Sequence, residues 1–328
     1  MRILIWHIHG DWMDAFVRGG HEYLLPVNAA RDRWGLGRGG RDWPDSAREV
    51  REDALRDEHV DLVVLQRPDE LDRVAELLGR APGRDLPAVY LEHDTPKAQP
   101  VTQRHPLADR DDIPLVHVTH FNRLVWDNGR APTRVIEHGI PDPGQRYSGW
   151  LPSLAVVINE PVRRWRVTGT DLLPRFAAVT PLDVFGMGTD GLAEVLGVPP
   201  ELVRTGGDMP GPRLHREMAV RRAYLHPFRW TSLGLTLLEA MAIGMPVLAL
   251  ATTETSRAVP REAGVVSNDP EELVAAAVRL MADADEARAM GEAGRRHVLE
   301  HYGLERFLAD WDAVLEERLA EATTTAIR

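Results

Sequence analysis

Histidines recur directly after apolar, β-branched runs in the first half of the chain. His9, His93 and His120 each follow such a run, and an imidazole can move a proton or hold a polar ligand near neutral pH. In open α/β sheets, ligands bind beyond the carboxyl ends of the strands, so these side chains are candidates for a polar site. The strand-like runs of this half are 2–8, 61–66, 87–92, 114–119 and 133–137.

His7 and His9 are separated by one residue, so on a strand both rings would point to the same face. This spacing is typical of metal-dependent hydrolases of the amidohydrolase type. That family often adds a bridging lysine, and Lys97, the single lysine of the chain, lies in a proline-containing loop. We keep the metal-dependent hydrolase as a minor alternative and expect no metal site.

Arginines gather after the first strand-like run of the second half. Arg163, Arg164 and Arg166 follow Asn159, and with one lysine in the chain the fixed cations must be arginines. Guanidinium groups bind phosphate oxygens in a bidentate manner, so the cluster indicates an anionic ligand. The strand-like runs of this half are 153–158, 181–185, 201–205, 223–227, 246–251 and 264–266.

Residues 231–244, TSLGLTLLEAMAIG, read as an apolar helix that carries a single carboxylate, Glu239. Thr231 or Ser232 could cap the start of this helix, Gly244 could end it, and its N-terminus would attract a phosphate. An ionised carboxylate buried without partners is costly. Glu239 therefore points either to solvent or to a ligand that offers hydroxyl donors, such as a ribose.

The stretch HPFRWTSLGLTLLEAMAIGMPVLALATTE at 226–254 resembles the donor-binding segment of retaining GT-B glycosyltransferases of the family-4 type. The pattern of that family runs P-S-x-x-E-G-F-G-L-x-x-L-E-A-M-A-x-G-x-P-V. The resemblance implies that Glu239 binds the ribose of a nucleotide. It also implies that backbone amides around Ser232, Leu233 and Gly234 cradle the diphosphate. The residues at matching places are Pro227, Gly234, Leu235, Leu238, Glu239, Ala240, Met241, Ala242, Gly244, Pro246 and Val247.

Two positions depart from the pattern of that family. Thr231 stands where the family has a first glutamate, which usually contacts the transferred sugar, and Thr168 stands where a lysine is expected. Arginines must then supply the cations for the diphosphate. We assign Arg163 and Arg164 to the leaving phosphate as catalytic residues, and Arg166 and Thr231 to donor binding.

The acceptor side of the same family is matched more weakly in the first half. AVYLEHDTP at 88–96 resembles a family strand that ends in a histidine near the reacting centre, which assigns His93 as catalytic. WHIHGDW at 6–12 and RGG at 18–20 stand where the family has its N-terminal glycine-rich acceptor loop, in the first strand-to-helix connection. Tryptophan rings commonly offer flat apolar faces to sugars. The acceptor-side candidates are His9, Gly10, Trp12, Gly19, Gly20 and His120.

A further glycine-rich stretch, GLGRGG at 35–40, looks like a phosphate loop. It neither follows a strand directly nor clearly opens a helix, so the dinucleotide-binding interpretation fails. We expect a mobile, basic loop here.

A chain of 328 residues with strand-like and helical segments in alternation predicts two α/β domains. We predict a GT-B architecture of two Rossmann-like domains, with mainly parallel sheets that face a central cleft. A breaker-rich stretch, PDPGQRYSGWLP at 141–152, separates the two sets of strands. The expected ranges are 1–148 for the acceptor-side domain, 149–303 for the donor domain and 304–328 for a C-terminal helix that packs back on the first domain and ends in a frayed tail.

Composition limits the partners and the compartment. A net charge of -11 argues against nucleic acid as a partner, and the absence of cysteine excludes disulfides and thiolate chemistry. No signal peptide and no run of about 18 apolar residues is visible, so we expect a cytoplasmic protein.

The expected activity is transfer of a sugar from a nucleotide-diphosphate sugar to an acceptor hydroxyl, as in carbohydrate biosynthesis. The acceptor could be a glycan, a lipid or a small natural product, with peripheral membrane contact only if it is a lipid. The resemblance implies retention of the anomeric configuration, and we expect no cofactor. A non-catalytic sugar-nucleotide binding protein and a GT-B epimerase stay open as alternatives.

Overall fold

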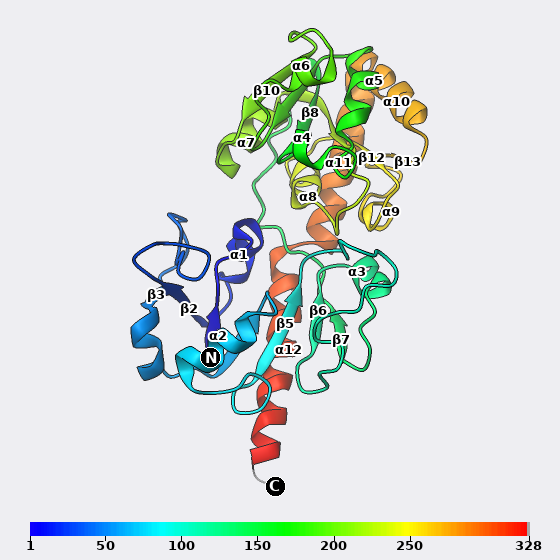
Figure 1. The fold of residues 1–328 in the computed structure, drawn as a ribbon. Helices are drawn as coiled ribbons and strands as arrows, with labels where there is room; N and C mark the ends of the chain where they lie inside the picture. The colour runs from blue at the N-terminus through cyan, green and yellow to red at the C-terminus, as the bar shows by residue number, and fades with distance from the viewer. Residues whose placement is uncertain (327–328) are drawn as a thin grey trace. The chain divides into compact units, whose positions relative to one another are not determined.

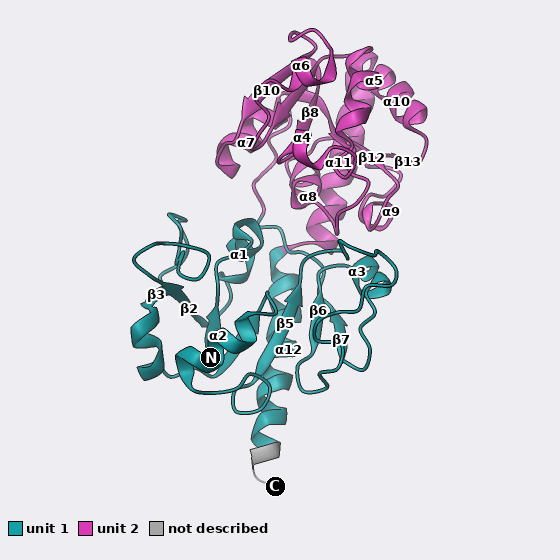
Figure 2. Ribbon diagram, in the orientation of Figure 1, with its two compact units in different colours: residues 1–141, 304–328 teal, residues 142–303 magenta. Residues whose placement is uncertain are grey.

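The computed structural model describes residues 1–326. The chain forms two compact units, each built on its own parallel sheet (Figure 1). Unit 1 contains residues 1–141 together with the C-terminal segment from Leu304, and unit 2 contains residues 142–303 (Figure 2). The prediction of two α/β units with parallel sheets is confirmed.

Unit 1 has a seven-stranded sheet in the order β3-β2-β1-β4-β5-β6-β7, and every neighbouring pair of strands is parallel. Helices cover such a sheet, so its central strand β4 is apolar throughout and all four of its residues are buried. The strands are β1 (Arg2–Ile5), β2 (Glu22–Val27), β3 (Ala47–Arg51), β4 (Leu62–Leu65), β5 (Ala88–Glu92), β6 (Leu115–His117) and β7 (Thr133–Val135). The helices are α1 (Gly10–Phe16), η1 (Glu52–Asp57), α2 (Glu70–Leu78), α3 (His120–Val125) and α12 (Leu304–Ala326).

Two strands of unit 1, β2 and β3, were not predicted from the sequence. Pro26 lies inside β2, and a proline within a run normally argues against a strand because it cannot donate a ladder hydrogen bond. β3 reads AREVR, in which charged residues outnumber apolar ones. The charges are tolerated because β3 is the edge strand of the sheet.

Unit 2 has a six-stranded parallel sheet in the order β10-β9-β8-β11-β12-β13. All six strand-like runs of the second half are strands, and Asp269 caps α10 as its position before Pro270 predicts. The strands are β8 (Leu151–Val157), β9 (Leu182–Phe185), β10 (Val203–Gly207), β11 (Arg221–His226), β12 (Val247–Leu250) and β13 (Gly264–Ser267). The helices are α4 (Pro161–Arg164), η2 (Thr170–Leu172), α5 (Leu173–Ala177), α6 (Leu192–Leu196), α7 (Gly211–Ala219), α8 (Leu235–Ala242), α9 (Thr255–Ala258), α10 (Pro270–Ala282) and α11 (Ala284–His301).

Residues 142–148, which the sequence placed in the first domain, belong to unit 2. The N–H groups of Arg146 and Tyr147 both donate to the carbonyl of Ile243 at 3.0 Å, and the N–H of Ser148 donates to Ala219 O at 2.9 Å. The hydroxyl of Tyr147 donates to Arg222 O at 2.7 Å. The glycines and prolines that resemble a linker therefore sit in a segment that is hydrogen-bonded to unit 2.

The C-terminal helix α12 packs against unit 1 through an aromatic cluster. Phe307, Trp311 and Leu315 on one stripe of α12 are buried, and the ring of Trp311 lies 5.6 Å from that of Trp12 and 5.0 Å from that of Phe16. The helix runs through Ala326, so residues 323–326 of the expected frayed tail are helical. The last two residues of that tail lie outside the described residues.

None of the helices within residues 1–326 is both long enough and apolar enough to cross a membrane.

Trp311→Ala removes the centre of the aromatic cluster that holds α12 on unit 1. Truncation of a buried aromatic side chain leaves a cavity, so we expect the free energy of unfolding to fall by about 3–5 kcal/mol in urea denaturation. Glu316→Ala on the exposed face of the same helix is the matched control and should change it by less than about 0.5 kcal/mol. Equal stability of the two variants would contradict the anchoring role.

Candidate functional site

The switch point of the unit 2 sheet lies between β8 and β11, where the strand order reverses direction. In sheets of this kind the chain leaves the two strands toward opposite sides, and ligands bind outside their carboxyl ends, so a site is expected here. Residues 158–169, which include the one-turn helix α4, follow β8, and residues 227–234 follow β11, so these two connecting loops lie at this point. Arg163, Arg164 and Arg166 come from the first loop, and Thr231 to Gly234 come from the second.

The two loops are fastened to each other. Gly169 has φ +71°, and a Cβ at this position would lie 1.9 Å from Pro227 O, so only glycine allows the approach. The N–H of Arg229 donates to Val167 O at 2.9 Å. A third strand end joins them, because the hydroxyl of Thr252 after β12 donates to Phe228 O at 2.7 Å.

Asp171 completes this fastening through charge. Arg229 donates to both carboxylate oxygens of Asp171, at 2.5 and 2.9 Å, and Arg166 donates to one of them at 3.1 Å. Burial by itself would raise the pKa of the Asp171 carboxyl, but the hydrogen bonds from Arg229 and the two positive charges hold that pKa below its usual value. Neither Asp171 nor Arg229 was a candidate from the sequence, because the two partners lie 58 residues apart.

The three arginines of the first loop have different neighbours. Arg163 is 72% exposed and lies 3.6 Å from Glu160, whereas Arg166 is bound to Asp171. The guanidinium of Arg164 lies 5.9 Å from the centre of the Phe228 ring, over the second loop. Thr168, which takes the place of the expected lysine, is buried against the hydroxyl of Thr170 at 2.8 Å. The Arg164 guanidinium thus lies over the loop before α8, and Arg166 meets the same loop through its carbonyl, which accepts from Arg229 at 2.9 Å.

Helix α8 begins at Leu235, and Gly234 is its N-cap. The expectation that Thr231 or Ser232 caps this helix is wrong, because both precede the cap and, within residues 1–326, no side chain caps α8. Leu233 is buried and anchors the loop by its side chain. The first-turn amides of α8 therefore lack a side-chain acceptor, which is the arrangement that binds phosphate groups at helix N-termini.

His226 lies beneath this helix start. A Cβ on Gly234 would be 2.7 Å from His226 Cε1, so the glycine cap lets the imidazole lie against the backbone. The His226 ring stacks on Phe228 with ring centres 4.6 Å apart, and its Nδ1 faces the Tyr224 hydroxyl at 3.3 Å. Burial lowers the pKa of His226 to about 3, so the ring is neutral at pH 7. Its Nε2 has no hydrogen-bond partner among the described residues.

Glu239 lies four residues into α8, with 22% of its side chain exposed. Its neighbours Leu238 and Ala240 are fully buried, which fixes the backbone on either side of the carboxylate. Glu239 Oε2 lies 3.6 Å from Nε2 of His215, which projects from α7. The carboxylate is thus half-buried beside an imidazole. The sequence left open whether Glu239 points to solvent or to a ligand, and the structure leaves the side chain partly exposed.

In unit 1, His93 is held by a buried amide at the carboxyl ends of β4 and β5. Gln66 Nε2 donates to Trp6 O at 2.8 Å, and Gln66 Oε1 lies 2.8 Å from His93 Nε2. A carbonyl can only accept, so the amide orientation is set and His93 Nε2 must carry the hydrogen, which leaves Nδ1 as an acceptor. His93 is 9% exposed, and the exposed His9 covers it with ring centres 4.0 Å apart.

The histidines of this edge are uncharged where they are buried. Burial lowers the pKa of His93 well below its usual value, and the neighbouring His9 and His138 lower it further. Burial likewise lowers the pKa of His138 to about 4. Neither ring nitrogen of His138, which follows β7, has a hydrogen-bond partner within the part of the chain that the structure describes. His138 was not among the histidines that the sequence indicated as candidates.

The His7–His9 spacing does not produce a metal pair. β1 ends at Ile5, so both residues follow the strand, and the alternation of a strand does not apply to them. His7 Nδ1 lies 2.9 Å from Gly37 O and its ring contacts Trp43, whereas His9 contacts His93. No group of three histidines or carboxylates suited to hold a metal ion occurs in residues 1–326.

Several acceptor-side candidates lie elsewhere than the sequence indicated. Trp12 is 2% exposed and packs in the aromatic cluster under α12, so its face is not open to a sugar. Gly19 and Gly20 lie between α1 and β2, in a helix-to-strand connection. Helix α1 returns the chain to the opposite edge of the sheet, because β1 and β2 are parallel, and this places both glycines away from the strand carboxyl ends.

Gly10 and His120 do lie at the carboxyl ends of strands. Gly10 opens α1 after β1, and a Cβ there would be 2.3 Å from Arg41 Nη2, so the Arg41 guanidinium covers this glycine. His120 is half-buried and opens α3 after β6. The structure thus brings His9, Gly10, His93 and His120 to one edge of the sheet of unit 1.

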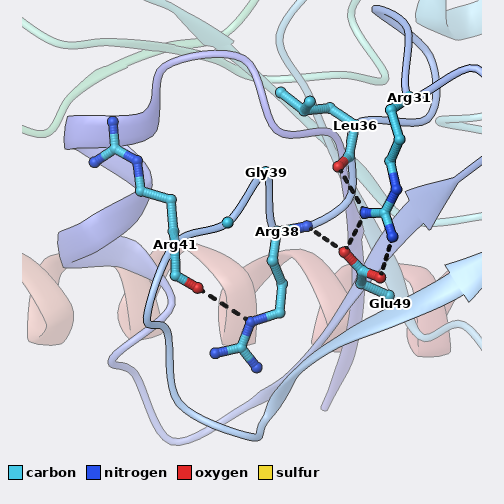
Figure 3. A pocket seen from close by; sticks show the side chains of 7 residues that line it. Arg31, Leu36, Arg38, Gly39, Arg41 and Glu49 are labelled. Atoms are coloured by element: carbon cyan, nitrogen blue, oxygen red, sulfur yellow. Dashed lines mark hydrogen bonds and ion pairs between the residues drawn. The ribbon is translucent and has the colours of Figure 1, made fainter.

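The glycine-rich loop between β2 and β3 borders an open hollow of about 590 Å³ (Figure 3). Arg31 donates to both oxygens of Glu49, at 2.5 and 3.0 Å, and the backbone N–H of Arg38 also donates to Glu49. The guanidinium groups of Arg38 and Arg41 point away from each other in Figure 3. The guanidinium groups of these arginines do not converge on one point. Their side chains therefore give no support to a phosphate-binding loop.

Two units that are each built on a parallel sheet are the GT-B architecture of nucleotide-sugar glycosyltransferases, and this chain has that fold. Residues 163–313 match the family described as "Glycosyl transferase-like". Sucrose-phosphate synthase (tll1590) from Thermosynechococcus elongatus is 16% identical with a TM-score of 0.74, over 98% of this chain and 100% of that chain. Anabaena Alr3699/HepE in complex with UDP is 13% identical with a TM-score of 0.71, over 97% and 100% of the two chains.

A glycosyltransferase from Rickettsia africae ESF-5 is 12% identical with a TM-score of 0.71, over 97% of this chain and 98% of that chain. No curated protein gave a sequence match to this chain.

His226 makes the stability of the protein depend on pH. The pKa of His226 is about 3 in the folded state and near 6.5 when unfolded, so below pH 6.5 the unfolded state binds a proton that the folded state refuses. Stability is therefore lost as the pH falls, by about 1.4 kcal/mol per pH unit for this group.

His226→Gln should remove about 2 kcal/mol of the loss in unfolding free energy between pH 7 and pH 5, measured by urea denaturation. His301→Gln, which replaces an exposed histidine of α11, is the control and should leave the pH dependence unchanged. An unaltered pH dependence in His226→Gln would show that the ring is accessible to protons in the folded state.

Proposed function

We propose that this protein is a glycosyltransferase that moves a sugar from a nucleotide-diphosphate sugar to an acceptor hydroxyl with retention of configuration. The observation that carries the proposal is the start of α8, where uncapped amides and a half-buried carboxylate occur on one short helix. The donor would bind to unit 2 and the acceptor to the edge of unit 1 that carries His9 and His93. The GT-B fold and the family match of residues 163–313 support this class.

The diphosphate would bind to the amides of Gly234 and Leu235, where the helix dipole favours negative charge. Glu239 lies four residues after Leu235, which is about 6 Å along the helix axis. A nucleotide laid along α8 would therefore bring its ribose hydroxyls to the carboxylate when its phosphates reach the helix start. UDP in the complexes of Alr3699/HepE and of the pneumococcal O-GlcNAc transferase GtfA supports a nucleoside diphosphate as the ligand class.

In the transfer step, the bond from the anomeric carbon to the diphosphate breaks and negative charge grows on the leaving oxygen. The α8 dipole and the arginines of the β8 loop would stabilise that charge, and the guanidinium of Arg164 lies over Phe228 in the loop before α8. We propose that this positive potential takes the place of a metal ion. Thr231 offers a hydroxyl where a carboxylate would hold the transferred sugar, so it should shape the choice of sugar.

On unit 1, His9 is exposed and His93 lies beneath it. We propose that His9 and His93 orient the acceptor hydroxyl. Both rings lie at the carboxyl ends of β1 and β5, and burial lowers the pKa of each, which favours the uncharged form. His93 is fixed as the Nε2–H form by Gln66, so its free Nδ1 can only accept a hydrogen bond. The acceptor would then bind at this edge of the sheet.

A non-catalytic sugar-nucleotide binding protein is the second candidate, and the observation that favours it is Thr231 in place of an acid. Both candidates predict donor binding, and turnover separates them. An epimerase would convert the donor with no acceptor present.

The donor class is tested by thermal shift with a panel of nucleoside diphosphates and their sugar conjugates. We expect the midpoint of unfolding to rise with at least one diphosphate, because a ligand that binds only the folded state stabilises it. Turnover is then measured as release of nucleoside diphosphate with and without chelator, and NMR of the product reports the anomeric configuration. No shift with any nucleotide would remove the proposal, and loss of turnover with chelator would remove its metal-free form.

Glu239→Gln should weaken binding of the nucleoside diphosphate by about 10- to 100-fold, because hydrogen bonds to a charged carboxylate contribute roughly 1.5–3 kcal/mol. Calorimetric titration measures the affinity, and the midpoint of thermal unfolding without ligand should stay within about 2 °C of the wild-type value. Glu262→Gln, on the exposed surface of unit 2, is the control. Wild-type affinity of Glu239→Gln would place the ribose elsewhere.

A further inference from the structure

His215 and Glu239 face each other across α7 and α8 without making a hydrogen bond. Nε2 of His215 lies 3.6 Å from Oε2 of Glu239, which exceeds the 2.7–3.2 Å of an N–H···O hydrogen bond. The His215 side chain is 13% exposed, and its Nε2 is closed to solvent and has no hydrogen-bond partner among the described residues. A buried polar atom of this kind calls for an explanation.

The unmet partner of His215 is the Glu239 carboxylate. Leu238 and Ala240 are fully buried, so the backbone beneath Glu239 is fixed and its carboxylate can adjust only by side-chain rotation. A movement of a few tenths of an ångström toward His215 would bring Oε2 into hydrogen-bond range. The other oxygen, Oε1, would then face away from α7 with its lone pairs free.

The other buried polar group near Glu239 is already engaged. Burial raises the pKa of the Tyr224 hydroxyl, and the nearby negative charge of Glu239 raises it further. That hydroxyl faces His226 Nδ1 at 3.3 Å. Tyr224 therefore does not orient the carboxylate, which leaves this role to His215.

We infer that His215 is a positioning residue that orients Glu239 to recognise the adjacent hydroxyls of a ribose. His215 takes Oε2 and thereby presents Oε1 to the 2′ and 3′ hydroxyl donors of the nucleotide. When these hydroxyls bind, they hold the carboxylate in the orientation that also satisfies the buried Nε2–H. The pair selects ribonucleotides over 2′-deoxyribonucleotides. This inference rests on the proposed function, because it assumes that a nucleoside diphosphate binds along α8.

The test compares the affinities of UDP, GDP and ADP with those of their 2′-deoxy counterparts by calorimetric titration. For the nucleotide that wild type binds, we expect the deoxy form to bind about tenfold more weakly, which is the effect of losing one hydrogen bond to a charged group. His215→Phe keeps a ring of similar shape and removes the donor. It should weaken the ribonucleotide about tenfold and reduce the ribo-to-deoxy preference toward one.

Two further variants separate positioning from support of the fold. His215→Gln retains an N–H donor that can reach Glu239, so it should recover most of the affinity and of the ribose preference. In the double variant His215→Phe with Glu239→Gln, the affinity should be no lower than that of Glu239→Gln alone, because His215 acts through Glu239. His301→Phe, at an exposed position of α11, is the matched control and should bind as wild type does.

The outcomes separate a failure of the proposed function from a failure of the role assigned to His215. If wild type binds none of the diphosphates, the proposed function fails and this inference fails with it. If wild type binds one and His215→Phe keeps its affinity and its ribose preference, the inference alone is overturned. If His215→Phe does not fold, His215→Leu replaces it, and an equal loss of affinity in His215→Leu and His215→Gln would overturn the positioning role.

Discussion

The close approach of Gly169 to the carbonyl of Pro227 brings together the two loops on which the proposed donor site of unit 2 is built. A side chain at position 169 would collide with that carbonyl, and the Asp171–Arg229 ion pair secures the same contact from the side. The segment that leads into α8 is thereby tied to the loop that carries the arginines. Without this fastening, the uncapped amides of α8 and the cations of the β8 loop would not be presented by one rigid frame.

In the candidate site of unit 2, the local placement of positive groups matters more than the net charge of the chain. The chain carries a formal charge of -11, yet three arginines and the positive end of a helix follow the neighbouring strands β8 and β11. Local fields of this kind act within a few ångströms, so an acidic protein can still bind an anionic ligand. The imidazole under the helix start is kept neutral by burial, so it adds a hydrogen-bonding group and no charge.

The edge of unit 1 follows a different physical logic. Its histidines are packed against one another, and burial keeps the inner ones uncharged. A single amide, that of Gln66, fixes which nitrogen of His93 carries the hydrogen. A hydroxyl group of the sugar acceptor at this edge would meet uncharged, oriented hydrogen-bonding groups. Such a surface suits a neutral hydroxyl better than it suits an anion.

The sequence determined the class of fold and the helix that carries Glu239, because both depend on local patterns. Apolar runs of three to seven residues predicted eleven of the thirteen strands, and the motif around residues 227–247 predicted the helix α8. The two strands it missed, β2 and β3, contain a proline and a run of charges, which neighbouring strands tolerate only once the sheet is formed. The cap of α8 was also misplaced, because several residues in TSLG could serve as a cap.

Tertiary structure alone decided which polar residues share a site. Gly19 and Gly20 lie close to His9 in sequence, but helix α1 carries them to the far edge of the sheet. Trp12 lies next to candidate residues and is taken into the core by α12, which comes from the other end of the chain. His215 and Arg229 meet Glu239 and Asp171 only through packing of separate elements. Sequence spacing reports neighbours along a strand or helix, whereas these contacts are set by how whole elements pack.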